Sequence, residues 1–340
     1  MKLAFIWGWY KYGTLAFWRS KEDSMQHAIA ELSKEHEVRM FVARKGLPRQ
    51  FINGQDVTFY QTSAELVNHL KQFKPRMIFM NSLSDPKWGS VIKAFPKTWK
   101  SIMDYGDPKP KLPFPQMVNN IIVQQEYQRA LVANMNNIPL SKVLVNPFCV
   151  DTSVFKPLPV EKTHTGIMVA DFRSNIKRQG LLIRAWKNIP GSLVLIGPFW
   201  RSRPPKYHVR CMELAKKLGI RKRVHILDGR PNHELPALIN KAKIAYYTSV
   251  REGGSRALLE MMSCGLPAIV MKDCLGTTSL IKHGVDGLVA DPTADGIRDA
   301  TNVVLKNWRK MGQAASKRIR SQYPYDRMLN FYRGLIRGVR

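Results

Sequence analysis

Acidic residues are scarce in this chain of 340 residues: 25 Asp and Glu stand against 54 Lys and Arg, which gives a formal net charge of +29. So positive a field attracts polyanions, namely nucleic acid, anionic lipid or acidic glycan, although a basic surface can also serve solubility alone. The excess is greatest in two segments, since residues 201–223 hold nine basic residues and one acidic, and residues 306–340 hold ten and one. The composition therefore predicts an anionic partner.

Cysteine is also sparse, with four residues in the chain. No pair has C-x-x-C spacing, and His, Asp and Glu do not cluster around any of the four at metal-ligand spacing. A disulfide framework and a zinc site are therefore disfavoured, and the pattern fits the reducing cytoplasm. The four are Cys149, Cys211, Cys264 and Cys274.

Long hydrophobic runs are missing as well. No stretch reaches the roughly 18 apolar residues that a membrane-spanning helix needs, and the apolar run at the start, MKLAFIW, is too short for the core of a signal peptide. Hydrophobic residues nevertheless make up 44% of the chain, which is enough for packed cores. A length of 340 residues suits two domains. We therefore expect a two-domain cytoplasmic protein that is soluble or at most peripheral to a membrane.

Short apolar segments alternate with amphipathic ones along the chain, which is typical of parallel sheets covered by helices on both faces. Helical patterns are clear over 24–34 and 64–73. The predicted strands of the first half are Lys2–Ile6, Val38–Val42, Val57–Tyr60, Met77–Met80, Ser101–Asp104, Ile121–Val123 and Lys142–Val145. Those of the second half are Gly166–Ala170, Leu193–Ile196, Val224–Leu227, Ile244–Tyr247, Ala268–Met271 and Gly287–Ala290.

Residues 146–161, NPFCVDTSVFKPLPVE, interrupt this alternation with three prolines and are interpreted as a linker. We therefore predict an α/β protein of two doubly wound, Rossmann-like domains, one over 1–148 and one over 149–322. A basic segment over 323–340 is expected to cross back to the N-terminal domain. Because ligands of such sheets bind beyond the carboxyl ends of the strands, the expected site is the cleft between the two facing domains.

The most informative segment is 248–292, TSVREGGSRALLEMMSCGLPAIVMKDCLGTTSLIKHGVDGLVADP. A predicted strand runs there into a loop that contains Gly253 and Gly254, and a helix with a buried apolar side follows. Glycine lets backbone N–H groups approach a ligand closely, and a helix N-terminus adds unpaired N–H donors and partial positive charge. These features predict an anion site suited to a diphosphate. Glu252 and Glu260 flank this turn and can reach different parts of one ligand.

This segment resembles the signature of the retaining GT-B glycosyltransferases, particularly family four: S-x-x-E-G-x-G-x-x-x-x-E-A-x-x-x-G-x-P. Ser255 stands at the second glycine of that signature and Met261 at its usual alanine. Residues that fall on the signature include Glu252, Gly253, Glu260, Gly265 and Pro267. The resemblance implies a GT-B fold, with two Rossmann-like domains across a cleft. It also implies transfer of a sugar from a nucleotide diphosphate to a hydroxyl with retention of the anomeric configuration.

The same resemblance assigns roles within the segment. In the family the second glutamate binds the ribose hydroxyls, and the first contacts the donor sugar and supports charge at the reacting carbon, which implies Glu260 and Glu252 in this chain. The phosphate side of the donor is assigned to Gly254, Ser255 and Arg256, and Gly253 is counted among the donor-binding residues. The implied donor is a nucleotide sugar, with uridine the commoner base, and no metal or other cofactor is required.

Three further segments extend the resemblance over much of the second half. Residues 146–157 resemble the interdomain motif N-G-V-D-x-x-x-F-x-P, and residues 282–288 resemble the late turn H-G-x-x-G-x-L. Residues 169–186 resemble a strand, basic loop and helix whose two cations grip the donor diphosphate, which implies catalytic roles for Arg173 and Lys177. Two cations beside a leaving diphosphate stabilise its developing charge. Arg178 replaces the family's usual glycine.

The first half matches the family mainly in the order of its strands and helices. Its loop over residues 8–14 departs from the family's glycine-rich loop, and Gly13 and Thr14 either lie under the donor phosphates or only turn the chain. Asp104 and Asp107 are interpreted as a tight turn rather than as metal ligands. The acceptor is expected on this domain, and the predicted acceptor-binding residues are Trp9, Tyr10, Lys11 and Asp104.

The charge leads to two candidate acceptors. We favour a hydroxymethylated pyrimidine base in DNA, whose backbone Lys and Arg would hold and whose base would be flipped out of the duplex. The alternative is a lipid or lipopolysaccharide at an anionic membrane surface, where basic and aromatic patches bind. A GT-B-like nucleic-acid-binding protein without catalysis is a further alternative, although such a binder has no need of Glu252, Glu260 and Lys177 together.

Overall fold

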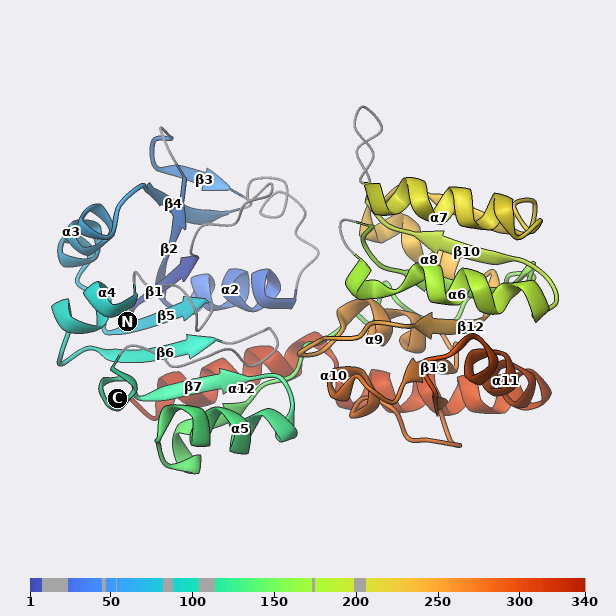
Figure 1. Cartoon of the computed structure of the whole chain (residues 1–340). Coiled ribbons are helices and arrows are strands. Elements are labelled where there is room, and N and C mark those ends of the chain that lie inside the picture. Colours follow the sequence, from blue (N-terminus) through green and yellow to red (C-terminus); the bar gives the residue numbers. More distant parts are fainter. Residues whose placement is uncertain are drawn as a thin grey trace. The chain divides into compact units, whose positions relative to one another are not determined.

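The computed structural model describes residues 1–7, 24–44, 47–52, 54–81, 88–103, 114–172, 175–198 and 206–339. The chain divides into two compact units, one made of Met1–Phe148 with Tyr325–Arg340 and the other of Cys149–Pro324 (Figure 1). Each unit is built around one sheet whose neighbouring strands are parallel, apart from one short edge strand. The predicted pair of Rossmann-like sheets is thereby confirmed.

The sheet of the first unit has the strand order β3-β4-β2-β1-β5-β6-β7-β8. The edge strand β3, which the sequence did not predict, pairs antiparallel with β4. The strands are β1 (Lys2–Trp7), β2 (Glu37–Ala43), β3 (Gln50–Ile52), β4 (Gln55–Tyr60), β5 (Met77–Asn81), β6 (Trp99–Met103), β7 (Asn120–Val123) and β8 (Val143–Val145). The helices are α2 (Ser24–Glu35), α3 (Ser63–Phe73), α4 (Trp88–Ala94), α5 (Glu126–Asn136) and α12 (Tyr325–Arg337).

The C-terminal helix α12 belongs to the core of the first unit, where it packs beside α2. Tyr332 is fully buried, and its ring meets those of Phe5 and Phe79 edge-on at centroid distances of 6.0 and 5.5 Å. Its hydroxyl donates to Sδ of Met103 at 3.3 Å. The last residues of the chain therefore complete a core that the first half of the chain begins.

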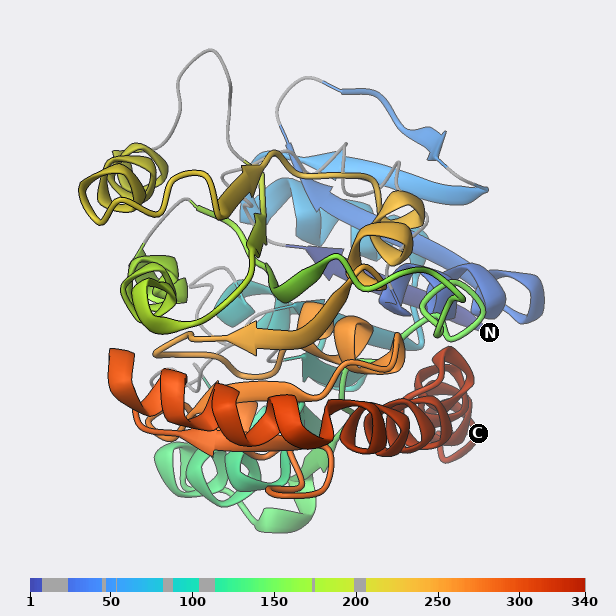
Figure 2. The ribbon, with the colours of Figure 1, turned by 90° about the vertical axis from the view of Figure 1, so that its right-hand side faces the viewer.

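The sheet of the second unit has the order β11-β10-β9-β12-β13-β14. Helices α6 and α7 lie on one side of it, and α8 and α9 lie on the other (Figure 2). The strands are β9 (His164–Val169), β10 (Leu193–Ile196), β11 (Val224–Leu227), β12 (Ala242–Tyr247), β13 (Ala268–Met271) and β14 (Gly287–Ala290). The helices are α6 (Gln179–Ala185), α7 (Lys206–Lys217), α8 (Leu235–Ile239), α9 (Arg256–Ser263), α10 (Leu275–Thr278) and α11 (Ala294–Gln322).

The order of this second sheet reverses between β9 and β12, which are neighbours in space but not in sequence. Gly166 of β9 makes their close packing possible, because a Cβ there would lie 2.5 Å from the rings of both Trp186 and Tyr246. The hydroxyl of Tyr246 also lies 2.8 Å from that of Thr301 on α11. In doubly wound sheets such a reversal is where ligands bind, beyond the carboxyl ends of the two strands.

The late turn over residues 282–288 leads from α10 into the start of β14. Buried Asp286 accepts a hydrogen bond from the N–H of Lys282 at 2.8 Å and pairs with Arg318 of α11. Gly287 lies so close to β13 that a Cβ would be 2.3 Å from the carbonyl oxygen of Ala268. This motif therefore has a structural role, which is to fix the outer edge of the sheet.

Two expectations from the sequence, on the state of the cysteines and on membrane-spanning helices, do not belong to either unit alone. The four cysteines are buried free thiols. Within the described ranges, no helix combines the length and the apolar character that crossing a bilayer requires.

Candidate functional site

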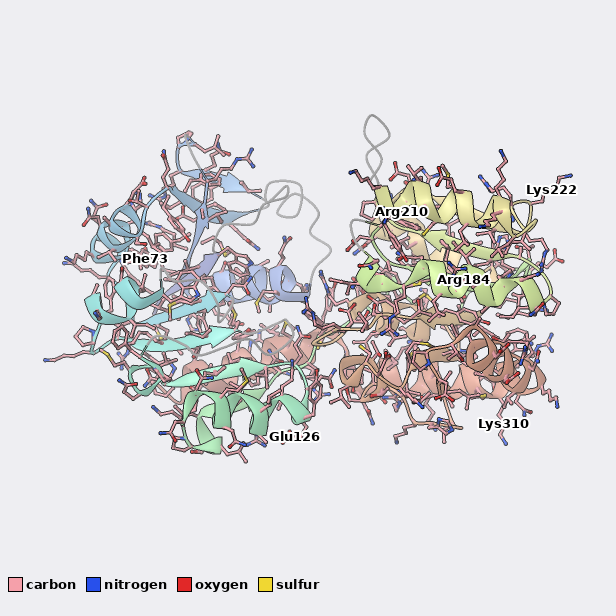
Figure 3. All side chains as sticks on the ribbon, in the orientation of Figure 1. Phe73, Glu126, Arg184, Arg210, Lys222 and Lys310 are labelled. Carbon is pink, nitrogen blue, oxygen red and sulfur yellow. The ribbon has the colours of Figure 1, made fainter. Side chains whose placement is uncertain are left out.

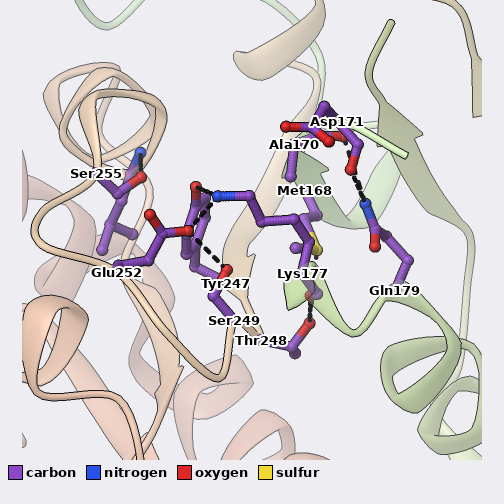
Figure 4. Close-up of polar contacts among 11 residues, drawn as sticks. Met168, Ala170, Asp171, Lys177, Gln179, Tyr247, Thr248, Ser249, Glu252 and Ser255 are labelled. Atoms are coloured by element: carbon purple, nitrogen blue, oxygen red, sulfur yellow. Dashed lines mark hydrogen bonds and ion pairs between the residues drawn. The ribbon is translucent and has the colours of Figure 1, made fainter. Parts of the chain in front are cut away.

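Two loops meet at the carboxyl ends of β9 and β12, where the second sheet reverses (Figure 4). One loop follows β9 and includes a short 3-10 helix, η3 (Asn175–Lys177). The other follows β12 and leads into α9. The N–H of Val250 donates to the carbonyl of Ile176 at 3.0 Å, and the hydroxyl of Thr248 donates to the carbonyl of Lys177 at 2.8 Å. These hydrogen bonds to backbone carbonyls therefore hold the two loops against each other.

An ion pair between Lys177 and Glu252 joins the side chains of the two loops. The exposed fractions of the two side chains are 17% and 13%, so the pair is largely withdrawn from solvent. Nζ of Lys177 also lies 3.3 Å from the hydroxyl of Tyr247, and the hydroxyl of Ser249 donates to Oε1 of Glu252 at 3.0 Å. Each charged group thus has a second polar partner, which is the condition for holding charge away from water.

The electrostatics of this cluster keep the lysine charged. Burial lowers the pKa of Lys177, but the neighbouring Tyr247 and Glu252 outweigh burial, so the pKa lies above its ordinary value. Burial raises the pKa of Tyr247 to about 12, although Lys177 acts in the opposite direction. Near neutral pH the site therefore presents a permanent ammonium group beside an uncharged phenol.

Helix α9 begins beside this cluster. Ser255 is its N-cap residue, and its hydroxyl oxygen accepts a hydrogen bond from the N–H of Leu258 at 3.2 Å. The same hydroxyl is hydrogen-bonded to Tyr247. Because the Ser255 side chain serves the helix and the tyrosine, any contact of this residue with a phosphate falls to its backbone N–H. Gly253 and Gly254, which precede it, widen the approach to the start of α9.

Gly276 of α10 packs directly against the backbone of the loop that follows β12. A Cβ at this position would lie 1.9 Å from the carbonyl oxygen of Glu252 and 3.1 Å from the carbonyl carbon of Gly253. Real Cβ atoms do not approach backbone so closely, so any side chain here would displace the loop. The backbone position of Glu252 therefore depends on a glycine that follows it by 24 residues in the sequence.

The backbone conformation of Arg178 accounts for the glycine that the family usually has at this position. Its φ of +51° lies in the left-handed region, where a residue with a side chain is disfavoured by roughly 1 kcal/mol or more. Its guanidinium binds the carboxylate of Asp273 through two contacts of 3.2 and 2.6 Å. This bidentate ion pair offsets part of the backbone strain.

The structure brings together part of the predicted site. Lys177 and Glu252 are in contact, the residues Gly253 to Arg256 form the loop and helix start beside them, and half-buried Glu260 follows in the second turn of α9. Other predicted site residues lie outside the described residues: Arg173, Gly13, Thr14, Trp9, Tyr10, Lys11, Asp104 and its neighbour Asp107.

Three residues of the site were not predicted from the sequence: Tyr247, Ser249 and Gly276. Tyr247 was predicted only as the last residue of a strand, and a polar group at the carboxyl end of a strand beside the sheet reversal was the signal that could have identified it. Gly276 carried no local signal, because its partner is backbone in a different loop. Among the described residues, no group of three His, Cys, Asp or Glu is placed to hold a metal ion.

Comparison with known proteins bears on both the family and the fold. The family described as glycosyl transferases group 1 matches residues 150–322, which is just over half of the chain and contains the whole cluster. A phosphatidylinositol N-acetylglucosaminyltransferase component from Arabidopsis thaliana is 29% identical over 132 residues. That alignment covers 37% of this chain and 28% of the relative, so the match spans less than a third of that protein's length.

Several solved structures share the fold over nearly the whole chain. Sucrose-phosphate synthase from Thermosynechococcus elongatus gives a TM-score of 0.82 at 14% identity, over 99% of this chain and 98% of that one. HepE from Anabaena, solved in complex with UDP, gives 0.79 at 16% identity, over 99% and 100%. The lipopolysaccharide outer core galactosyltransferase WaaB gives 0.73 at 18% identity, over 99% of each chain. At identities this low, the structural similarity establishes the shared fold alone. The predicted GT-B architecture is confirmed.

We expect Gly276→Ala to lower the free energy of unfolding by about 1–3 kcal/mol, because the added methyl group must push the backbone of Glu252 aside. Urea denaturation followed by circular dichroism measures this loss. Gly334→Ala in α12 is the matched control, since a Cβ there meets nothing within 4 Å, and alanine favours a helix. Equal stability of the two variants would contradict the proposed packing of α10 on the loop.

Proposed function

We propose, since the chain belongs to the family of group 1 glycosyl transferases, that it transfers a sugar from UDP-sugar to a hydroxyl group and that the Cys149–Pro324 unit holds the donor. The family match covers this unit almost completely. HepE, which has the same fold, was solved with UDP and with UDP-glucose. The loops that meet at the sheet reversal lie where such folds bind nucleotides.

The observation that carries the proposal is the ion pair between Lys177 and Glu252. A diphosphate carries more negative charge than a carboxylate and accepts more hydrogen bonds, so a bound donor competes with Glu252 for the ammonium of Lys177. Lys177 then neutralises the diphosphate, and Glu252 is released toward the sugar. The ion pair therefore holds both groups in place until the donor binds and parts them.

The start of α9 extends this site toward the rest of the donor. Its first N–H groups and its partial positive charge favour the phosphates, and Arg256 at the first helical position adds a cation there. We assign Glu260, one turn further along the helix, to the ribose hydroxyls, as the family resemblance implies. Arg173 is assigned to the diphosphate on the same ground.

The chemical step follows from these assignments. The bond between the anomeric carbon and the diphosphate oxygen breaks, and its electron pair leaves with UDP. The acceptor oxygen forms the new bond to the anomeric carbon, and its proton passes to the departing phosphate oxygen. Lys177 stabilises the negative charge that develops on the diphosphate, and Glu252 stabilises the positive charge on the sugar. We propose retention of the anomeric configuration, as in the family that the sequence resembles.

For the acceptor we propose a lipid or lipopolysaccharide at an anionic membrane surface. Two of the relatives, WaaB and the phosphatidylinositol N-acetylglucosaminyltransferase component, are named for acceptors of this kind. The net charge of +29 suits an anionic surface equally well as it suits nucleic acid. A hydroxymethylated base in DNA stays the second candidate, and it rests on the charge alone.

The roles of the ion pair predict opposite effects of two substitutions. We expect Glu252→Gln to reduce sugar transfer by about 100-fold or more, since it removes a charge from the transition state. We expect the same variant to bind UDP as well as the wild type or better, because no carboxylate then competes with the diphosphate for Lys177. We expect Lys177→Ala to weaken UDP binding by about tenfold or more. Calorimetric titration with UDP and turnover of radiolabelled UDP-sugars measure both effects, with exposed Lys310→Ala as the control. Unchanged UDP affinity in Lys177→Ala would contradict the assignment.

The acceptor is tested by incubating the protein with a pool of UDP-sugars and three substrates in parallel. The substrates are a lipopolysaccharide and anionic-lipid extract, DNA containing hydroxymethylcytosine, and unmodified DNA. Mass spectrometry identifies the products, and Glu252→Gln is the inactive control. We expect an added sugar mass in the lipid fraction alone. A sugar on hydroxymethylcytosine would overturn the membrane acceptor and favour DNA instead.

A further inference from the structure

A concave surface of the Cys149–Pro324 unit lies between α6 and α7, which are neighbours on the same side of the sheet (Figure 2). Its volume is about 630 Å³. Three exposed cations line it, Arg184 from α6 and Arg210 and Lys217 from α7; the first two are labelled in Figure 3. We call this surface the α6–α7 groove. Arg210 and Lys217 belong to the basic segment 201–223, and neither is part of the donor site.

Among the described residues, the positive charge of the groove is only partly balanced. Arg184, Arg210 and Lys217 form no ion pair within the described residues, whereas Arg178 at the end of the groove is paired with Asp273. Glu213 is the one acidic residue among the described residues that line the groove. Three cations and one carboxylate leave a charge of +2, which matches a phosphate monoester or a diphosphate group.

The floor of the groove is apolar and fixed. Leu181 and Leu214 form part of the lining, together with the buried thiol of Cys211. The phenol oxygen of Tyr207 accepts a hydrogen bond from the N–H of Gly180 at 2.9 Å, which ties α7 to the start of α6. A rim of cations above an apolar floor suits a ligand that is charged at one end and carbon-rich at the other. Arginine in particular pairs with phosphate through two parallel hydrogen bonds.

We propose that the α6–α7 groove binds a doubly charged phosphate group, held by Arg184, Arg210 and Lys217. This chemistry has two sources, the phosphorylated headgroup of a membrane lipid and a free phosphate compound. The proposal does not rest on the proposed function. The side chains that carry it differ from those of the donor site, where Lys177 is engaged with Glu252 and Tyr247.

The test compares two double variants that remove the same charge. Arg184→Gln with Arg210→Gln alters the groove, and Lys306→Gln with Lys310→Gln alters exposed positions of α11 that do not line it. The first probe is inorganic pyrophosphate, titrated calorimetrically with saturating UDP present so that the donor site is occupied. The second probe is a set of phosphatidylcholine vesicles with phosphatidic acid, a phosphate monoester, or with phosphatidylglycerol, a diester, at equal surface charge.

We expect the groove variant to lose roughly tenfold or more of its affinity for pyrophosphate or for phosphatidic acid vesicles, and the α11 variant to lose little. Loss for pyrophosphate alone identifies a free phosphate compound as the ligand. Loss that is greater for phosphatidic acid than for phosphatidylglycerol identifies a lipid headgroup. Equal losses in the two variants, or no binding of either probe to the wild type, would overturn the proposal.

The same experiment separates this proposal from the proposed function. Both double variants are expected to bind UDP with wild-type affinity, because neither alters the donor site. If UDP does not bind the wild type but pyrophosphate is lost only in the groove variant, the groove stands and the proposed donor falls. If pyrophosphate binds only when UDP is absent and the groove variant retains it, pyrophosphate occupies the donor site and the groove proposal is wrong.

Discussion

The ion pair between Lys177 and Glu252 is the interaction on which the rest of the site depends. It joins two loops that the sequence separates widely, and it forms because β9 and β12 end side by side at the reversal of the second sheet. Two charges so far withdrawn from water are stable only as partners and only with further polar neighbours, which Tyr247 and Ser249 provide. Any ligand that parts them has to replace what each loses, and a sugar diphosphate has groups for both.

The surrounding structure holds this pair without occupying it. Thr248 and Val250 tie the loops together through backbone carbonyls, Gly276 lets α10 support the backbone of Glu252, and Ser255 begins α9 beside the cluster. None of these contacts uses the ammonium of Lys177. The scaffold is therefore fixed while the charged groups are exchangeable, which is the arrangement that catalysis by preorganised charge requires. Arg178, next in the chain, is committed to Asp273 instead.

Most of this fold could be predicted from the sequence because the evidence for it is periodic. Alternating apolar segments located the described strands of both sheets except β3, an edge strand of three residues none of which is buried. Lys177 and Glu252 were predicted from two separate segments that resemble the family, and the sequence alone could not show that they pair with each other. Tyr247 and Gly276 were missed because their roles depend on contacts between separate loops. The groove between α6 and α7 was visible in the sequence only as an excess of basic residues in 201–223, since composition does not show which cations lack a carboxylate.

A crystal structure of this protein with bound UDP would decide whether the donor takes the place of Glu252 beside Lys177. We predict that a phosphate oxygen lies within hydrogen-bonding distance of Nζ of Lys177, that the ion pair with Glu252 is opened, and that the carboxylate of Glu252 faces the position of the donor sugar. UDP bound elsewhere, or bound with the Lys177–Glu252 pair intact, would contradict the proposed exchange.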